Sequence, residues 1–284
     1  MFAIILSTKL IWEIVMSEFF GVNGYQRMPE GAYSWQHLTF VIVGFLIVIS
    51  AGILLGRTYK NADEKKKNLV LLFTAIVMDT MEVSKIILVC VRIGNPMNWI
   101  YELPLFLCSI QLIAIPFAAL TKGRIKEAAL DFIFTFGVLG ALLGTLGGAQ
   151  IFNKYPVLSY DVLVFCMTHL LAGFAAVYIA ASGMTSMKKK NLPITMGILV
   201  GFCVIAYIMY CIVDYNYMFL VRSDGTPYQV LYDLVGGNPV LYPIGVVLLF
   251  FLYIFAFNLI YHRFADKKKA AVSESEGEKI PEQV

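Results

Sequence analysis

The chain has 284 residues, of which 59% are hydrophobic and 14% are charged, and its formal net charge at neutral pH is +3. An average soluble domain is roughly a quarter charged, so this composition excludes a water-soluble globular protein. The positive charges fall in loops between apolar stretches, which indicates contact with anionic lipid rather than binding of nucleic acid.

The N-terminal segment, residues 2–20, is apolar apart from a few polar residues that include Lys9, Glu13 and Ser17, spaced four apart. That spacing places these three side chains on one stripe of a helix. A signal peptide is not indicated, because neither a basic n-region nor a small-residue cleavage site is evident. We therefore predict that residues 1–34 form an interfacial amphipathic helix and an external segment, and an eighth span is the alternative.

Seven apolar stretches follow, and each is long enough for one α-helix to cross the roughly 30 Å hydrocarbon layer. They lack the alternation that is typical of membrane strands. The sequence therefore predicts an all-α polytopic membrane protein with a seven-helix domain over residues 35–264. The predicted spans lie near residues 37–56, 69–93, 100–121, 127–148, 160–183, 193–214 and 238–261.

Basic residues follow the first, third, fifth and seventh spans, whereas the other loops hold few. Loops rich in Lys and Arg stay on the cytoplasmic side of a membrane. This pattern predicts an external N-terminus and a cytoplasmic C-terminus, in which the polar residues 265–284 form a disordered tail. The basic residues are Arg57, Lys60, Lys65–Lys67, Lys122, Arg124, Lys126, Lys188–Lys190, His262, Arg263 and Lys267–Lys269.

Several small or sulfur-containing residues in the spans have a structural interpretation. Glycines four apart indicate close helix packing. The five cysteines are dispersed through the spans and form no disulfide framework. The cysteines and histidines show no metal-ligand spacing, and no nucleotide-binding motif is present, so neither a metal nor a cofactor is predicted. The glycine sets are Gly52 and Gly56; Gly140, Gly144 and Gly148; and Gly197 and Gly201.

The second span carries Asp79, Glu82 and Lys85. A charged residue inside a membrane costs at least about 2.5 kcal/mol on insertion scales, which makes each a functional hypothesis by default. Glu82 and Lys85 are three residues apart and share a helix face, so an ion pair that joins helices is the structural alternative.

Cys108 in the third span and His169 in the fifth lie at the same predicted depth. Each is about 12 Å below the outer start of its span at 1.5 Å per residue, and Lys85 lies at a similar level. A thiol beside an imidazole can act as a nucleophile toward an acyl carbonyl. Gln111 shares a helix face with Cys108 and, like Lys85, is a candidate donor to the oxyanion. The structural alternative is that Cys108 is only a small buried residue and that His169 forms a hydrogen bond between two helices.

Residues 103–108, Leu-Pro-Leu-Phe-Leu-Cys, resemble a motif of the YwaF-like family of bacterial integral membrane proteins, in which histidine takes the place of Phe106. His37, His169 and the segment Asn216-Tyr217-Met218 also resemble positions of that family. Gly236-Gly237-Asn238-Pro239 with Tyr242 is similar to its entry to the last span, although the family's tryptophans are absent. The resemblance covers residues 35–262.

Animal relatives of that family are acyltransferases that move a polyunsaturated acyl chain between phospholipids without coenzyme A, through a cysteine acyl-enzyme. The resemblance implies that Cys108 is the nucleophile and His169 the base, with His37, Asn216 and Tyr217 as supporting residues. It also implies membrane lipids as partners and a bacterial plasma membrane as the location.

Two functions remain open at this point. The first is a phospholipid acyltransferase or lipid-ester hydrolase that uses Cys108 and His169. The alternative is a proton-coupled or small-solute transporter whose relay consists of Asp79, Glu82, Lys85 and His169. The absence of an inverted repeat argues against a transporter. The external loop 215–237 is rich in tyrosine, and we interpret it as a lid that folds back on the membrane.

Overall fold

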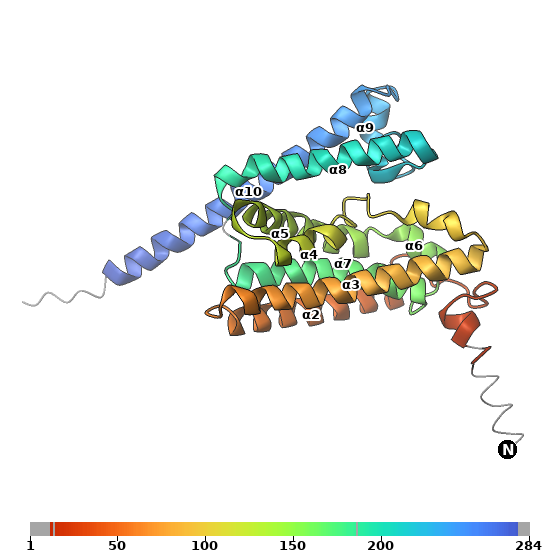
Figure 1. Ribbon diagram of the computed structural model, residues 1–284, viewed down its shortest axis with the longest axis horizontal. Helices are drawn as coiled ribbons and strands as arrows, with labels where there is room; N and C mark the ends of the chain where they lie inside the picture. The colour runs from red at the N-terminus through yellow and green to blue at the C-terminus, as the bar shows by residue number, and fades with distance from the viewer. Residues whose placement is uncertain (1–11, 14, 186, 278–284) are drawn as a thin grey trace, which may run out of the picture.

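The computed structural model describes residues 12–13, 15–185 and 187–277, and every regular element within these ranges is helical (Figure 1). The predicted amphipathic helix over residues 2–20 falls largely outside the described residues. The long helices are α2 (Trp35–Thr58), α3 (Glu64–Ile93), α5 (Gly123–Leu146), α7 (Tyr160–Ala181), α8 (Leu192–Val213) and α10 (Leu241–Gly277). The short ones are α4 (Gln111–Leu120), α6 (Ala149–Lys154), α9 (Gln229–Leu234), a π-helical turn (Val15–Phe19), and 3₁₀ turns at Pro96–Glu102, Lys189–Asn191 and Tyr217–Phe219.

Polar side chains mark where the long helices begin. Ser34, Asp63 and Ser159 accept hydrogen bonds from backbone N–H groups in the first turns of α2, α3 and α7. These bonds satisfy donors that have no partner within the helix itself. At its other end, α3 stops at Gly94, whose φ of 70° is the left-handed conformation that favours glycine at a helix C-terminus.

Five stretches of the described chain are long and apolar enough to cross a membrane. They agree with the first, fourth, fifth, sixth and seventh predicted spans. The second predicted span forms α3, which is 30 residues long but carries Asp79, Glu82 and Lys85 within its apolar part. The five are Trp35–Thr58, Gly123–Lys154, Tyr160–Ala181, Lys189–Val213 and Leu241–Asp266.

The third predicted span, residues 100–121, is not one continuous helix. A 3₁₀ turn ends at Glu102, an irregular segment follows, and only the ten residues of α4 are α-helical. Pro104 explains the break, because proline has no N–H and disfavours the helical conformation of the residue before it. Leu103 accordingly has extended dihedral angles, with φ −58° and ψ 146°.

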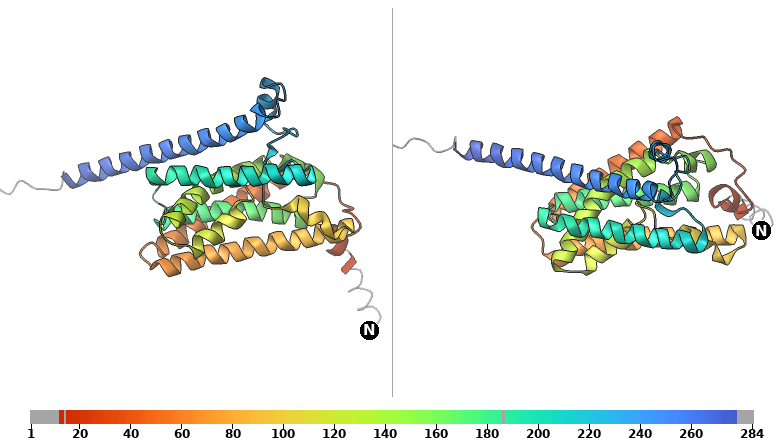
Figure 2. Two further views of the ribbon diagram at one scale, coloured as in Figure 1. Left: turned by 45° about the horizontal axis from the view of Figure 1, so that its top comes forward. Right: turned by 90° about the horizontal axis from the view of Figure 1, so that it is seen from above.

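The helices form a body and a second layer. Helices α2, α3, α4, α5 and α7 make up the body, while α8 and α10 lie together along one side of it (Figures 1 and 2). At Gly52 and Gly56 of α2, an added Cβ would press against Val177 and Ala181 of α7. These two glycines therefore allow the close helix approach that their spacing predicted.

The basic loops meet at one end of the body, which we call the basic end. Lys126 Nζ lies 2.5 Å from Glu64 Oε1, and Lys188 Nζ lies 2.7 Å from Glu127 Oε1. The His262 ring bonds the Met187 carbonyl at 3.0 Å. The segments that follow α2, α4 and α7 and the last part of α10 thus share one end. We call the other end, where α3 stops and α7 begins, the distal end.

Helix α10 corrects one expectation about the C-terminal tail. A disordered tail was expected from residue 265, but the helix continues through Gly277. Residues 267–272 are Lys-Lys-Lys-Ala-Ala-Val, and Lys and Ala are strong helix formers, so helical propensity extends beyond the apolar stretch. Residues 278–284 lie outside the described part of the chain.

Candidate functional site

Cys108 lies in the turn that leads into α4. The break at Pro104 brings the chain to this turn, and the N–H of Gln111 bonds the Cys108 carbonyl at 3.3 Å as the helix starts. The thiol is partly buried, and its sulfur lies 4.0 Å from the Ser109 hydroxyl. A continuous helix through residues 100–121 would not have placed a cysteine at a helix start.

His169 on α7 lies next to this thiol, and the two side chains interact electrostatically. Its other side is fixed, since Nδ1 lies 2.6 Å from the Phe165 carbonyl. A carbonyl can only accept a hydrogen bond, so Nδ1 carries the proton and Nε2 is left as the basic nitrogen. The fold therefore joins the two residues that the sequence placed at one depth.

Two glycines of α5 leave room for this pair. A Cβ added at Gly144 would overlap the His169 ring, with Cδ2 and Nε2 as its nearest neighbours. A Cβ at Gly140, one turn earlier, would stand 3.8 Å from the Cys108 Cβ. The spacing of these glycines predicted a role in helix packing. At position 144, however, glycine is needed because a larger residue would overlap the His169 imidazole. The spacing of the glycines alone gave no signal of this.

The glycine pair Gly197 and Gly201 on α8 has no such role. An added Cβ at either position would meet no heavy atom within 4 Å in the described ranges. The close helix contact that their spacing predicted is therefore absent from this part of the structure. In contrast to Gly52, Gly56 and Gly144, these two glycines face open space.

Gln111 is completely buried at the start of α4, three residues after Cys108. Neither its Nε2 nor its Oε1 has a hydrogen-bond partner among residues 12–13, 15–185 and 187–277. A buried amide without partners costs free energy, since it loses the hydrogen bonds that water would supply. Such an uncompensated donor, three residues from the Cys108 thiol in the chain, is free to bond a ligand.

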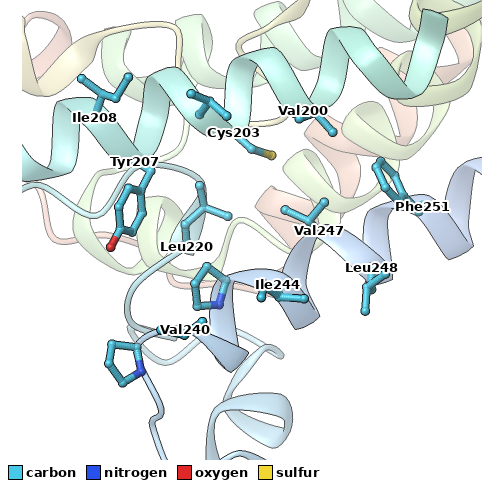
Figure 3. A pocket seen from close by; sticks show the side chains of 13 residues that line it. Val200, Cys203, Tyr207, Ile208, Leu220, Val240, Ile244, Val247, Leu248 and Phe251 are labelled. Carbon is cyan, nitrogen blue, oxygen red and sulfur yellow. The ribbon is translucent and has the colours of Figure 1, made fainter. Parts of the chain in front are cut away.

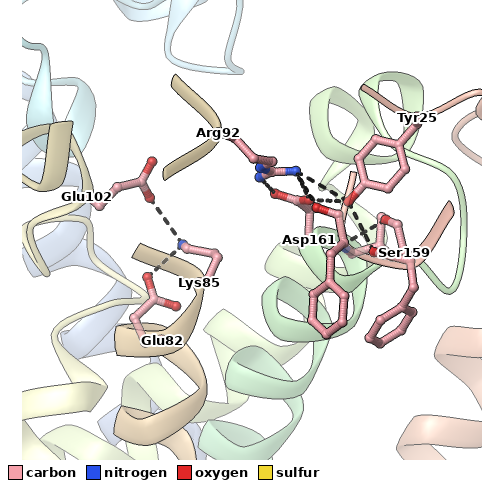
Figure 4. Close-up of polar contacts among 10 residues, drawn as sticks. Tyr25, Glu82, Lys85, Arg92, Glu102, Ser159 and Asp161 are labelled. Carbon is pink, nitrogen blue, oxygen red and sulfur yellow. Dashed lines mark hydrogen bonds and ion pairs between the residues drawn. The ribbon is translucent and has the colours of Figure 1, made fainter. Parts of the chain in front are cut away.

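A charged triad lies between α3 and the 3₁₀ turn at Pro96–Glu102 (Figure 4). Lys85 Nζ is 2.7 Å from Glu82 Oε1 and 3.2 Å from Glu102 Oε2. The ion pair that the spacing of Glu82 and Lys85 predicted is thus present, and Glu102 joins it. Glu82 also interacts electrostatically with His169, which connects the triad to the thiol and imidazole.

A second polar cluster, the clamp, consists of Tyr25, Arg92 and Asp161 (Figure 4). Arg92 donates from Nη1 and Nη2 to the two Asp161 oxygens at 2.7 and 2.6 Å, and the Tyr25 hydroxyl donates to Asp161 as well. Burial raises the pKa of the Tyr25 hydroxyl, and its hydrogen bond to Asp161 raises it further. The clamp ties the N-terminal segment to α3 and α7. The sequence prediction did not include it, because Asp161 lies at the end of an apolar stretch.

The segment 215–237 contacts the chain before α4, at Ile100 and Phe106. Asn216 holds its turn, since Nδ2 donates to the Arg222 carbonyl at 2.6 Å and to Asp224 at 2.7 Å. The Tyr217 hydroxyl donates to the Ile100 carbonyl. Burial raises the pKa of the Tyr228 hydroxyl, and the nearby Cys108 thiol adds to this increase. Asn216 and Tyr217 thus position the loop, and Tyr228, which interacts electrostatically with Cys108, is a residue that the sequence prediction did not place at the site.

His37 lies apart from the thiol, at the start of α2. Its Nδ1 accepts from the Tyr33 N–H at 2.9 Å, its Nε2 bonds the Thr145 carbonyl at 2.9 Å, and its ring stacks on Phe152. Both ring nitrogens are therefore held by backbone groups. Of the predicted site residues, Cys108, His169 and Glu82 interact with one another, Lys85 pairs with Glu82, and His37 instead stacks on Phe152 of a separate apolar cluster.

Comparisons with known proteins agree with this architecture. The model of the TMEM164 family matches residues 32–261, which is most of the chain. The match does not test the resemblance of residues 35–262 to the YwaF-like family, which stays a prediction. Comparisons with curated proteins and with solved structures found no significant match.

Proposed function

The chain belongs to the TMEM164 family, and from its paired thiol and imidazole we propose that it is a membrane phospholipid acyltransferase that acts without coenzyme A. The observation that carries this proposal is the proximity of the interacting Cys108 and His169 side chains, with Nδ1 of the imidazole fixed on the Phe165 carbonyl. A nucleophile, an adjacent base and a group that orients the base are the arrangement that covalent acyl transfer uses. The relationship to the YwaF-like family is part of the proposal.

The first half of the reaction forms an acyl-enzyme. His169 Nε2 takes the thiol proton, and the Cys108 sulfur attacks the ester carbonyl carbon of a phospholipid. The oxyanion that forms accepts a hydrogen bond from the Gln111 amide, which has no other partner in the described chain. The carbon–oxygen bond to glycerol then breaks, His169 returns the proton to the departing oxygen, and a lysophospholipid leaves.

The second half transfers the acyl chain. The free hydroxyl of another lysophospholipid gives its proton to His169 and attacks the thioester carbon. The carbon–sulfur bond breaks, and the Cys108 thiolate recovers the proton from the imidazole. If water replaces the lysophospholipid, the product is a free fatty acid, so the same groups also support ester hydrolysis.

The proposed membrane topology has seven crossings, with the N-terminus outside and the C-terminus cytoplasmic. Contacts between Lys126 and Glu64 and between Lys188 and Glu127 support it, because they gather the basic loops at one end. In this topology α3 and the broken segment 96–120 add two crossings to the five apolar helices. The distal end, with the Cys108 site, then faces the outer leaflet of a bacterial plasma membrane.

The test is acyl transfer by purified protein in nanodiscs that contain a phospholipid with an isotope-labelled acyl chain and an unlabelled lysophospholipid. We expect transfer by the wild type and by Cys211→Ala, whose cysteine is exposed on α8, and none by Cys108→Ala. Intact-mass analysis should detect an acyl adduct only when Cys108 is present. Normal lipid turnover by Cys108→Ala would overturn the proposal.

A solute transporter is the second function, and one observation favours it. Asp79 Oδ1 is buried on α3 without a hydrogen-bond partner in the described chain, as a proton-binding carboxyl would be. Under this function, pH-dependent solute uptake by proteoliposomes should be lost in Glu82→Gln and unaffected in Cys108→Ala. Acyl transfer without any uptake would exclude it.

A further inference from the structure

An apolar groove of about 560 Å³ lies between α8 and α10 (Figure 3). The two helices separate toward the α9 end, and the side chains of both, together with Leu220, line the space that opens between them. The lining includes no charged side chain, and its polar atoms are limited to the Cys203 thiol and the Tyr207 hydroxyl.

The depth of the groove matches one leaflet of a bilayer. Its lining runs from Val240, just before α10 at the distal end, to Phe251 within the helix. The ten helical steps from Leu241 to Phe251 span about 15 Å at 1.5 Å each. Half of the hydrocarbon core is about 15 Å. Both helices are among the five stretches that are long and apolar enough to cross a membrane, so the groove opens toward hydrocarbon rather than water.

The inner wall of the groove separates it from the Cys108 site. Cys203 Sγ donates to Met218 Sδ at 3.4 Å, and Leu220 points into the groove among Ile244 and Val247 (Figure 3). Phe219, between Met218 and Leu220, packs against Phe106 and Tyr228 on the Cys108 side, with ring centroids 5.5 and 6.3 Å apart. One short segment therefore contacts both the groove and the surroundings of the thiol.

That segment has an unusual backbone. Met218 and Phe219 have φ values of 57° and 55°, in the left-handed region that costs a side-chain-bearing residue about 1–3 kcal/mol. The hydrogen bonds of Asn216 and Tyr217 hold the turn that imposes these angles. The fold thus maintains a strained turn in the short segment that contacts both the groove and Phe106.

We propose that this groove binds one acyl chain of a phospholipid from the leaflet at the distal end, with the glycerol and headgroup near Pro239 and Tyr207. The assignment rests on the proposed function for its role, which is to hold substrate lipid next to the wall formed by Met218, Phe219 and Leu220. The chemical class of the ligand is inferred from the groove alone. A chain without charge or hydrogen-bonding groups matches a lining without charge, and its length matches one leaflet.

The test is photolabelling in nanodiscs with a phosphatidylcholine that carries a diazirine in one acyl chain, followed by mass-spectrometric mapping of the modified residues. We expect labels to concentrate on groove residues such as Val200, Ile244 and Leu248. Leu46 and Ile47 on α2, which are 63% and 62% exposed, report ordinary contact with lipid. Ile244→Trp fills the groove and should lower its labelling about tenfold, a factor that corresponds to about 1.4 kcal/mol.

Leu249→Trp is the matched control, because Leu249 is also exposed on α10 but does not line the groove. It should leave the labelling unchanged. Labelling of the groove no stronger than that of α2 would mean bulk lipid only and would overturn the proposal. Crosslinks between the groove and a second copy of the chain, with the groove protected from lipid labelling, would also overturn the proposal.

Photolabelling and the acyl-transfer assay, each carried out with the wild type and with Cys108→Ala, distinguish this proposal from the proposed function. Selective labelling without acyl transfer by the wild type would overturn the acyltransferase and leave the groove assignment standing. Transfer that depends on Cys108, together with uniform labelling, would overturn the groove and leave the enzyme.

Discussion

Two polar clusters near the distal end, the clamp and the Cys108 site, differ in how completely their polar atoms are hydrogen-bonded. In the clamp, both Asp161 oxygens accept from Arg92, and Tyr25 adds a third donor. In the Cys108 site, the Gln111 amide is buried three residues from the thiol with no partner in the described chain.

The difference indicates what each cluster does. Buried polar groups in a structural contact are normally satisfied, because an unpaired one costs about 1–3 kcal/mol. The clamp follows this rule, and its function is to attach the N-terminal segment to α3 and α7. In the Cys108 site the buried Gln111 amide breaks this rule, because it has no partner in the described chain. This is expected where a ligand supplies the missing partner. The following variants test this contrast, from the largest expected effect to the smallest.

Gln111→Leu should lower the rate of acyl transfer but raise the stability of the protein. Loss of an oxyanion donor lowers a catalytic rate by about 10²–10³. The same change removes a buried polar group, so the thermal midpoint in detergent should rise rather than fall. Rates of acyl transfer and unfolding curves measure the two effects. Gln150→Leu, at an exposed position on α6, is the control and should change neither.

Asp161→Ala should have the opposite profile. It leaves the Arg92 guanidinium, which is 13% exposed, without its carboxylate. Loss of one partner of a buried pair costs about 3 kcal/mol, which a thermal unfolding assay would detect. Replacement of both residues, as Arg92→Met with Asp161→Leu, should restore most of the stability. A double variant as unstable as the single one would contradict this account of the clamp.

Gly144→Ala should damage the Cys108 site without a change in any reactive group. The added Cβ overlaps the His169 ring, so the imidazole must shift from its position next to the thiol. A displacement of about 1 Å can cost about 10²-fold in rate. The rate of acyl transfer and the rate of Cys108 alkylation by iodoacetamide should both fall. Gly197→Ala, where a Cβ meets no described atom within 4 Å, should preserve both rates.

Glu64 should give the smallest effect, at the basic end. A hydrogen bond from Lys126 lowers the pKa of its carboxyl below the ordinary value of 4.5. A carboxyl with a lowered pKa adds stability above its unfolded value, and this contribution disappears as the pH falls through the folded value. Glu64 is 66% exposed, so the contribution should stay within about 1 kcal/mol. The stability difference between wild type and Glu64→Gln should therefore be present at neutral pH and vanish well below pH 4.5.

Much of the fold could be predicted because its signals are local in the sequence. Apolar stretches such as residues 160–183 are read directly from composition, and basic loops mark one end of the body. The third span was an exception, since composition measures hydrophobicity and does not register the break that Pro104 imposes on the backbone. The tail was another, because polarity predicted disorder where helical propensity continues α10 to Gly277.

The sequence by itself determined that the chain is a helical membrane protein and that Cys108 and His169 lie at similar depths, because hydrophobicity and helix rise depend only on the order of residues. Tertiary structure decided that the thiol and the imidazole face each other, that Gly144 makes room for the ring, and that Gln111 is left without a partner. These outcomes depend on how each helix is rotated and where its backbone breaks. Packing between segments distant in the chain sets the rotation of each helix, which no pattern along one segment encodes, whereas the break before Cys108 follows from Pro104.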